Sequence, residues 1–267
     1  MTSPASSVVP APATKPNALF EYLLRLGDDR LILGHRLSEW CGHGPILEED
    51  IALANVALDL LGQATILLRM AGEVEGRGRN EDALAYFRDA VEFRNCQMLE
   101  LPNGDFGLTM ARQFLFDVFD VVLLEALTKS SNAELAAVAA KSLKEARYHV
   151  RHSGEWMLKL GDGTDESHRR VQRALDELWR FTPELFAMDD VDAELVHAGI
   201  APDLAELKPK WESLVREVLD RATLTAPNDV PRPPRARGGR TGAHTEHLGH
   251  LLAEMQIVAR SHPGASW

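Results

Sequence analysis

The feature that most constrains the fold is a long apolar stretch with a regular polar line, Glu48 to Met70. It reads EEDIALANVALDLLGQATILLRM, opens with three acids and carries Asn55, Asp59 and Gln63 at four-residue spacing. Residues four apart lie on one stripe of a helix. A carboxylate in the middle of a buried helix is costly unless it is paired, hydrogen-bonded or bound to metal. The stretch therefore predicts a buried helix in which Asp59 has such a partner.

The same stretch is the part of the sequence nearest to a membrane span. Asp59 would lie at the centre of such a span, Ile51 to Leu68, at a cost of about 2.5–3.5 kcal/mol. We interpret it as a bundle helix and expect no membrane association. The formal net charge of -11 argues against binding nucleic acid, because phosphate contacts need a basic surface. Cys41 and Cys96 form no CxxC pair and no signal peptide precedes the helices, which favours the cytoplasm.

The hydrophobic pattern predicts an all-α protein, because no segment alternates with a period of two. Residues 1–16 are expected to be a disordered leader and residues 17–267 a single helical domain with a flexible Pro/Gly/Arg loop at about 225–243. Four long helices, capped first by Asn17 and last by Ser131–Asn132, suit an up-down bundle with added C-terminal helices. Gly27 and Gly34 suggest a bend or close packing in the first helix. The expected helices cover residues 17–41, 48–72, 106–129 and 133–160, with one or two shorter ones in 81–100 and others at 166–188, 203–223 and 245–260.

Acids recur among apolar neighbours on all four long helices. In chain order they are Glu39, Asp59, Asp117 with Asp120, and Glu145. This resembles the skeleton of a carboxylate-bridged di-iron bundle, which takes an acid from each of two helices and a Glu-x-x-His pair from each of the other two.

The histidines of that skeleton are missing. Three residues past Asp59 stands Gly62, and three past Glu145 stands Tyr148. His149 lies one residue further, so a site with one displaced histidine stays open. The other interpretation is that these acids pair with cations in a dry core, with Arg36, Arg112, Lys144 and Arg147 as candidates.

Two C-terminal patterns have similar alternatives. His244, His247, His250 and Glu254 fall on one side of a helix and could bind zinc, or they could belong to a helix capped at Thr245. The preceding loop holds Arg232, Arg235, Arg237 and Arg240, which could contact an acidic partner, a phosphate group or only solvent. Neither a nucleophile motif nor a phosphate loop occurs, and Cys41 beside His43 is more typical of packing than of catalysis.

Several blocks of the sequence resemble the C subunits of the bacterial phenylacetyl-CoA epoxidases. They cover about residues 17–260 in the family's order. The blocks are LRLGDDRLILGHRLSEWCGHGPILEEDIALANVALDLLGQA, LPNGDFGLTMARQFLFDVF, KEARYHVRHSGEWMLKLGDGTDES, LWRFTPELF and HTEHLGHLLAEMQ.

The resemblance implies a ferritin-like fold and a structural, non-catalytic role beside a paralogous A subunit that holds the di-iron centre and binds the CoA thioester. A small B subunit and a reductase with flavin, an iron–sulfur cluster and NADPH complete such a system, which epoxidises the ring of phenylacetyl-CoA. In this chain no cofactor is then expected, and Glu39, Asp59, Gly62, Asp117, Glu145 and Tyr148 would mark a vestigial metal pocket.

Two further hypotheses stay open at this point. The chain could be a self-sufficient di-iron or zinc enzyme that uses Glu39, Asp59, Asp117, Glu145 and His149. It could also be a stand-alone bundle that binds ligands without chemistry. Metal in the purified chain would favour the enzyme, and indifference to an A subunit would favour the stand-alone bundle.

Overall fold

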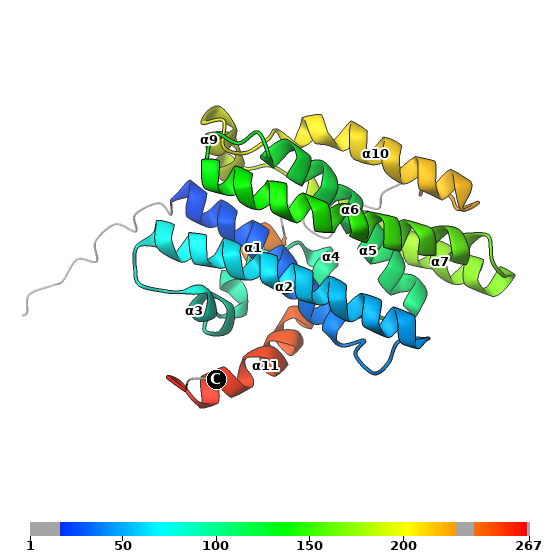
Figure 1. The fold of residues 1–267 in the computed structure, drawn as a ribbon, viewed down its shortest axis with the longest axis horizontal. Coiled ribbons are helices and arrows are strands. Elements are labelled where there is room, and N and C mark those ends of the chain that lie inside the picture. The colour runs from blue at the N-terminus through cyan, green and yellow to red at the C-terminus, as the bar shows by residue number, and fades with distance from the viewer. Residues whose placement is uncertain (1–16, 228–237, 266–267) are drawn as a thin grey trace, which may run out of the picture.

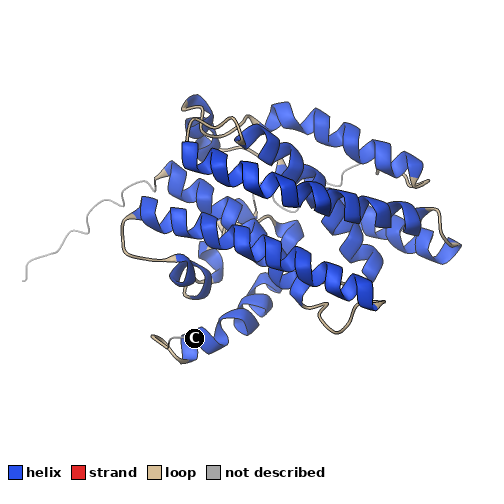
Figure 2. Cartoon of the chain, in the orientation of Figure 1, coloured by secondary structure: helices blue, strands red, loops and turns tan. Residues whose placement is uncertain are grey.

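The computed structural model describes residues 17–227 and 238–265, and within these ranges it contains helices and loops but no strand (Figure 2). The all-α prediction is confirmed. The leader, residues 1–16, lies outside the described residues, as do Arg232, Arg235 and Arg237 of the arginine loop.

Four long helices form the bundle: α1 (Ala18–Ser38), α2 (Leu47–Glu75), α5 (Phe106–Leu127) and α6 (Ala133–Gly161). α1 pairs with α2, and α5 pairs with α6 (Figure 1). The crossover between the two pairs carries α3 (Glu81–Tyr86), η1 (Ala90–Glu92) and α4 (Gln97–Glu100). It returns the chain, so that α5 runs parallel to α2 (Figure 1). One long crossover of this kind is the connectivity of ferritin-like bundles.

The remaining helices cover the bundle from two sides. On one side, α7 (Asp165–Leu178) and α10 (Leu204–Arg221) pack on α5 and α6, and α9 (Asp190–His197) packs on α1. On the other side, α11 (Glu246–Ser261) packs against α3, η1 and α4. The short elements are η2 (Trp179–Phe181), α8 (Thr182–Leu185) and η3 (Gly239–Thr241).

Helix ends follow the capping residues that the sequence indicates. The side chains of Asn17 and Asn132 accept hydrogen bonds from the backbone N–H groups of Leu19 and Leu135, at 2.9 and 3.0 Å. Both predicted caps are confirmed. The first helix ends at Ser38 rather than Cys41, because the chain turns there and reaches a left-handed conformation at Gly42 (φ 80°).

The predicted helix at 166–188 is broken, and α9 was not predicted. Pro183 lacks a backbone N–H and so cannot donate the hydrogen bond that a continuous helix would need there, although it is tolerated in the first turn of α8. The chain instead forms α7, η2 and α8 in succession. The eight residues of α9 lie in an acidic segment whose cap, Asp189, also pairs with Arg25 of α1.

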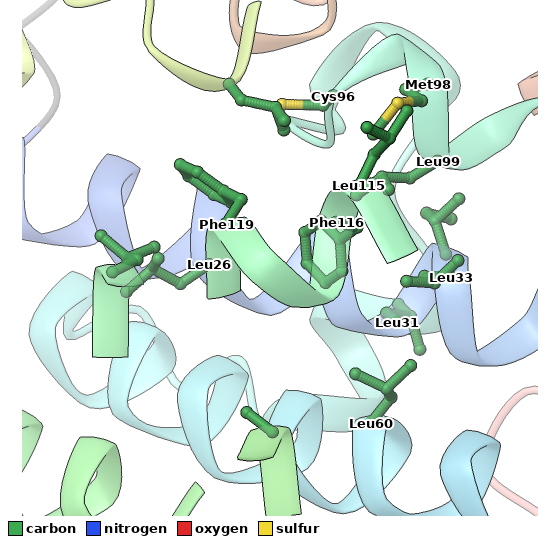
Figure 3. Packing of buried hydrophobic residues seen from close by; sticks show 14 of the residues in the cluster. Leu26, Leu31, Leu33, Leu60, Cys96, Met98, Leu99, Leu115, Phe116 and Phe119 are labelled. Carbon is green, nitrogen blue, oxygen red and sulfur yellow. The ribbon is translucent and has the colours of Figure 1, made fainter. Parts of the chain in front are cut away.

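The core confirms that α5 is central, since its residues are buried on nearly every side. Leu115, Phe116 and Phe119 of α5 lie among leucines of α1 and α2 and the sulfur-bearing side chains of the crossover (Figure 3). Gly27 and Gly34 allow α1 and α2 to approach closely. A methyl group there would come within 2.9 Å of Leu68 and 3.0 Å of Leu61, respectively.

The expectation that α2 is mostly buried is wrong. Among the described residues it is the one helix that is long and apolar enough to cross a membrane. Of its apolar 18-residue stretch, 44% is buried. The core helix of a bundle meets the same criterion, and α2 packs along α1. Its opposite side is open: Ile51 is 52% and Leu58 66% exposed.

Candidate functional site

A chain of polar side chains crosses the centre of the bundle, with one residue from each long helix. Arg30 of α1 pairs with Asp120 of α5, and its Nε donates to Gln63 Oε1 of α2 at 2.8 Å. Gln63 Nε2 in turn donates to Glu145 Oε2 of α6 at 2.8 Å. Arg30 and Asp120 are each 2% exposed. The guanidinium therefore neutralises a buried carboxylate at the point where the four helices meet.

Arg30 reaches this place because of its position on α1. It belongs to the buried stripe Leu23, Leu26, Arg30, Leu33 and Leu37, whose three- and four-residue spacing keeps it on one face. Its Nη1 also donates to the carbonyl of Leu26 at 3.0 Å. Burial raises the pKa of Asp120, and the charge of Arg30 opposes that rise.

Asp117 lies one helical turn before Asp120 and has a different environment. Its carboxylate accepts from Gln113 Nε2 at 2.6 Å and from Ser153 Oγ at 2.7 Å, and no cation of the described residues pairs with it directly. Burial raises the pKa of Asp117 to about 7, although the charge of His149 and both hydrogen bonds lower it. Gln113 Oε1 has no hydrogen-bond partner in the part of the chain that the structure describes. A proton on Asp117 would supply one after rotation of the Gln113 amide.

α2 and α6 are joined by three polar bridges. Besides Gln63–Glu145, His149 Nε2 lies 3.1 Å from Asp59 Oδ2, and His152 Nε2 lies 2.8 Å from Glu49 Oε2. We call these three pairs the α2–α6 seam. The expectation that Asp59 has a polar partner is confirmed, but its side chain is 40% exposed rather than buried. It lies at the edge of the bundle because Gln63, not Asp59, points to the centre.

Besides Asp59, three of the six residues assigned to a vestigial pocket lie outside the centre. Glu39 follows the end of α1, is 39% exposed at its side chain, and binds Arg36 and Asn103. Gly62 is exposed on the outer side of α2. Tyr148 is 44% exposed and stacks on His152. Counting three residues past each acid selects the wrong face in both helices, because Gln63 and His149, four residues on, are the ones that point inward.

Of the four cations expected to pair with the acids, Arg36 pairs with Glu39, after the end of α1 and outside the centre, and the other three lie elsewhere. Arg36 donates to the carbonyl of Glu100, Arg112 donates to that of Leu101, and Arg147 pairs with Glu125 at the surface. Lys144 is exposed. Arg30, which takes the role, was missed. Arg30 could have been identified from its position in the middle of an otherwise leucine-rich stripe.

The donor set of the centre does not match a metal site. Among the described residues no group of three or more His, Cys, Asp or Glu side chains lies close enough to hold a metal ion. Both oxygens of Asp117 and one oxygen each of Asp120 and Glu145 already accept hydrogen bonds, from Gln113, Ser153, Arg30 and Gln63. A carboxylate-bridged di-iron centre needs those oxygens and two inward imidazoles, whereas here only His149 is available.

A second buried polar cluster holds the C-terminal segment on the bundle. Arg240 pairs with Asp29 at 2.7 Å, and Gly239 N donates to Glu184 Oε1 at 2.8 Å. The charge of Asp29 raises the pKa of Arg240 although burial opposes it. Of the four arginines in the loop, Arg240 therefore forms an internal ion pair and does not serve to bind a ligand.

The C-terminal histidines do not form one site. His244 Nδ1 lies 2.7 Å from Glu100 Oε2, beneath the start of α11, and Thr245 N donates to Glu100 Oε1. Burial opposes charge on His244, but the bond to Glu100 outweighs it and raises its pKa. Since His250 is exposed, the predicted stripe does not converge. Thr245 is the N-cap residue, as predicted, but its side chain makes no cap bond.

These features define an all-helical, ferritin-like bundle whose centre is closed by an arginine and whose seams are polar. The chain belongs to the family described as phenylacetic acid catabolic protein, whose model matches residues 5–267. It is 49% identical over 251 residues to the C subunit of the 1,2-phenylacetyl-CoA epoxidase of Escherichia coli (strain K12), and the match covers 94% of this chain and 100% of that protein. The resemblance to C subunits is confirmed.

Proposed function

We propose that this chain is a non-catalytic structural subunit of a multicomponent oxygenase that epoxidises the ring of phenylacetyl-CoA in aerobic phenylacetate catabolism. It would pack against the di-iron A subunit in the cytoplasm, with the small B subunit and the flavin and iron–sulfur reductase completing the system. The similarity to an epoxidase C subunit along the whole length of that protein supports the assignment.

The observation that carries the structural role is Arg30. A fixed cation that pairs with Asp120 and binds Gln63 occupies the region where a di-iron bundle concentrates its ligands. A positive side chain there repels a metal cation and binds oxygens that the metal would need as ligands. The chain would therefore contribute shape and contacts to the complex, and the redox centre would belong to its partner.

The test is co-expression with the A-type subunit, followed by iron analysis of the complex and of this chain purified alone. We expect a stable complex whose iron follows the A subunit, less than about 0.1 iron per isolated chain, and turnover of phenylacetyl-CoA only when both subunits and the reductase are present. About two iron atoms per isolated chain, lost in a Glu145→Ala variant, would refute the proposal in favour of a self-sufficient enzyme.

A further inference from the structure

One side of α2 has no partner within the described chain. Ile51, Asn55, Leu58, Gly62 and Thr65 recur at three- and four-residue spacing, are all exposed, and include no charged residue. We call these five residues the α2 outer face. Ile51 is 52% and Leu58 66% exposed. An uncharged surface that follows several turns of a long helix is unusual for an exposed helix face, which normally carries charges.

Gly62, in the middle of this face, has no explanation within the fold. A glycine inside a helix is unfavourable relative to alanine, so its presence calls for a reason. Gly27 and Gly34 have one, because an added methyl group would press on Leu68 and Leu61. At Gly62 an added Cβ would meet no atom of residues 17–227 or 238–265 within 4 Å. The absence of a side chain would instead permit another backbone to approach α2 from outside.

The helix α6, which the seam joins to α2, carries exposed cations that we call the basic rim. Lys141, Lys144 and Arg151 are exposed, and the Arg151 guanidinium lies 5.3 Å from the Tyr148 ring centroid. Lys141 and Tyr148 project on the side of α6 that adjoins the seam, since the turn of 100° per residue puts them beside Glu145 and His152.

This rim reverses the charge of the molecule as a whole. Between Glu134 and Glu155 the only acid on α6 is Glu145, which is bound to Gln63. The exposed charge of that stretch is thus positive in a chain of net charge -11. Such a local reversal fits a partner with carboxylates around its contact surface, whereas a second copy of this chain would present the same cations.

We propose that the α2 outer face and the basic rim form the docking surface for a helix of the catalytic partner subunit. The contacting helix would present apolar side chains that pack over Gly62 and Leu58, bordered by carboxylates that meet Lys141, Lys144 and Arg151. The inference rests on the proposed function, because it requires that partner. Beyond the proposed function, it identifies the face of this chain that contacts the partner and the kinds of side chain that the partner must present.

The experiment compares full-length variants, co-purified with the A-type subunit and titrated against it in a binding assay. Gly62→Leu and Leu58→Glu are each expected to weaken binding at least tenfold. Lys144→Glu is expected to slow association at low ionic strength. Gly249→Leu and Ile257→Glu on α11 are the matched controls, since Gly249 is equally open and Ile257 is 60% exposed, and they should bind as the wild type does.

Folding is monitored separately in each variant. Gly62→Leu replaces glycine by a good helix former in open space, so the thermal midpoint of the isolated chain should stay the same or rise while binding falls. This opposite response of stability and binding distinguishes a docking surface from a folding defect.

The outcomes separate the two proposals. If the wild-type chain does not bind the A-type subunit at all, the proposed function fails. If it binds and Gly62→Leu and Leu58→Glu bind equally well, only the assignment of the face is overturned. An isolated chain that is dimeric by light scattering and made monomeric by Gly62→Leu would assign the face to a second copy. Binding to phosphatidylserine vesicles that Leu58→Glu abolishes, with unchanged partner binding, would assign it to a membrane surface.

Discussion

Replacing Arg30 by methionine tests whether a cation holds the centre of the bundle together. The variant keeps a long apolar stem but leaves Asp120 buried without its partner and Gln63 Oε1 without its donor. Breaking a buried ion pair from one side costs about 3–5 kcal/mol, and an unsatisfied buried carbonyl adds about 1–3 kcal/mol. We expect Arg30→Met to lose at least about 4 kcal/mol of unfolding free energy at pH 8.

The loss should depend on pH. Burial already raises the pKa of Asp120, and removal of Arg30 takes away the charge that opposes this rise. The folded-state pKa of Asp120 in the variant then lies well above its unfolded value. A carboxyl group of this kind is tolerated in its neutral form, so the variant loses stability as the pH rises through the folded-state pKa. The deficit at pH 5 should be smaller than that at pH 8.

The assay is urea unfolding followed by circular dichroism, at both pH values, on a double-mutant cycle of Arg30→Met and Asp120→Asn. The double variant should recover most of the loss, with a coupling energy of at least about 2 kcal/mol at pH 8. Arg147→Met is the control, because its partner Glu125 is at the surface and the cost should stay below about 1 kcal/mol. Additive losses in the cycle, or an Arg30→Met chain as stable as the wild type, would refute the reasoning.

Two further predictions concern other parts of the core. The pKa of Asp117 is about 7 in the folded state, above its ordinary value, so the wild type should lose stability as the pH rises from about 4 to about 7. Asp117→Asn should remove that loss and gain up to about 4 kcal/mol at pH 8 but nothing at pH 4, which thermal unfolding across this range can measure. Gly161→Ala should destabilise despite the better helix propensity of alanine, because the added methyl group would lie 2.2 Å from the carbonyl oxygen of Ala222. A net loss of at least about 1 kcal/mol in urea unfolding is expected, and a gain of about 1 kcal/mol would show that only propensity matters there.

Much of the architecture could be predicted from the sequence, for a physical reason. The long helices combine a strong 3.6-residue period with local caps such as Asn17 and Asn132, and both signals depend on neighbouring residues alone. The segment 166–190 was harder, because Pro183 interrupts it and α9 is held by a distant ion pair from Asp189 to Arg25. Contacts between remote segments leave no local pattern.

The polar centre was only half predictable. Asp117, Asp120 and Glu145 could be found because acids stand out in apolar helices. Their partners could not, because cations were expected, whereas Asp117 and Glu145 bind neutral side chains and the cation that pairs with Asp120, Arg30, lies on another helix. Asp59 and Tyr148 were misplaced for a different reason: a one-residue error in helical phase turns a side chain by 100°. The hydrophobic pattern predicts reliably that a helix faces the core. It predicts less reliably which of two adjacent residues points inward.

The exposed face of α2 and its polar seam have a common explanation. An apolar centre of the same volume would often be as stable as one built on an ion pair, so stability alone does not account for Arg30, Gln63 and Glu145. Hydrogen bonds are directional, whereas contacts between leucines are not. They therefore fix how far one helix hairpin is shifted along the other. The bridges Gln63–Glu145 and Asp59–His149 set the position of α2 against α6, and therefore the position of the apolar face beside the basic rim. Arg30→Met should accordingly weaken partner binding even where the helix content is unchanged, whereas Gly161→Ala, at the far end of α6, should lower stability with a smaller effect on binding.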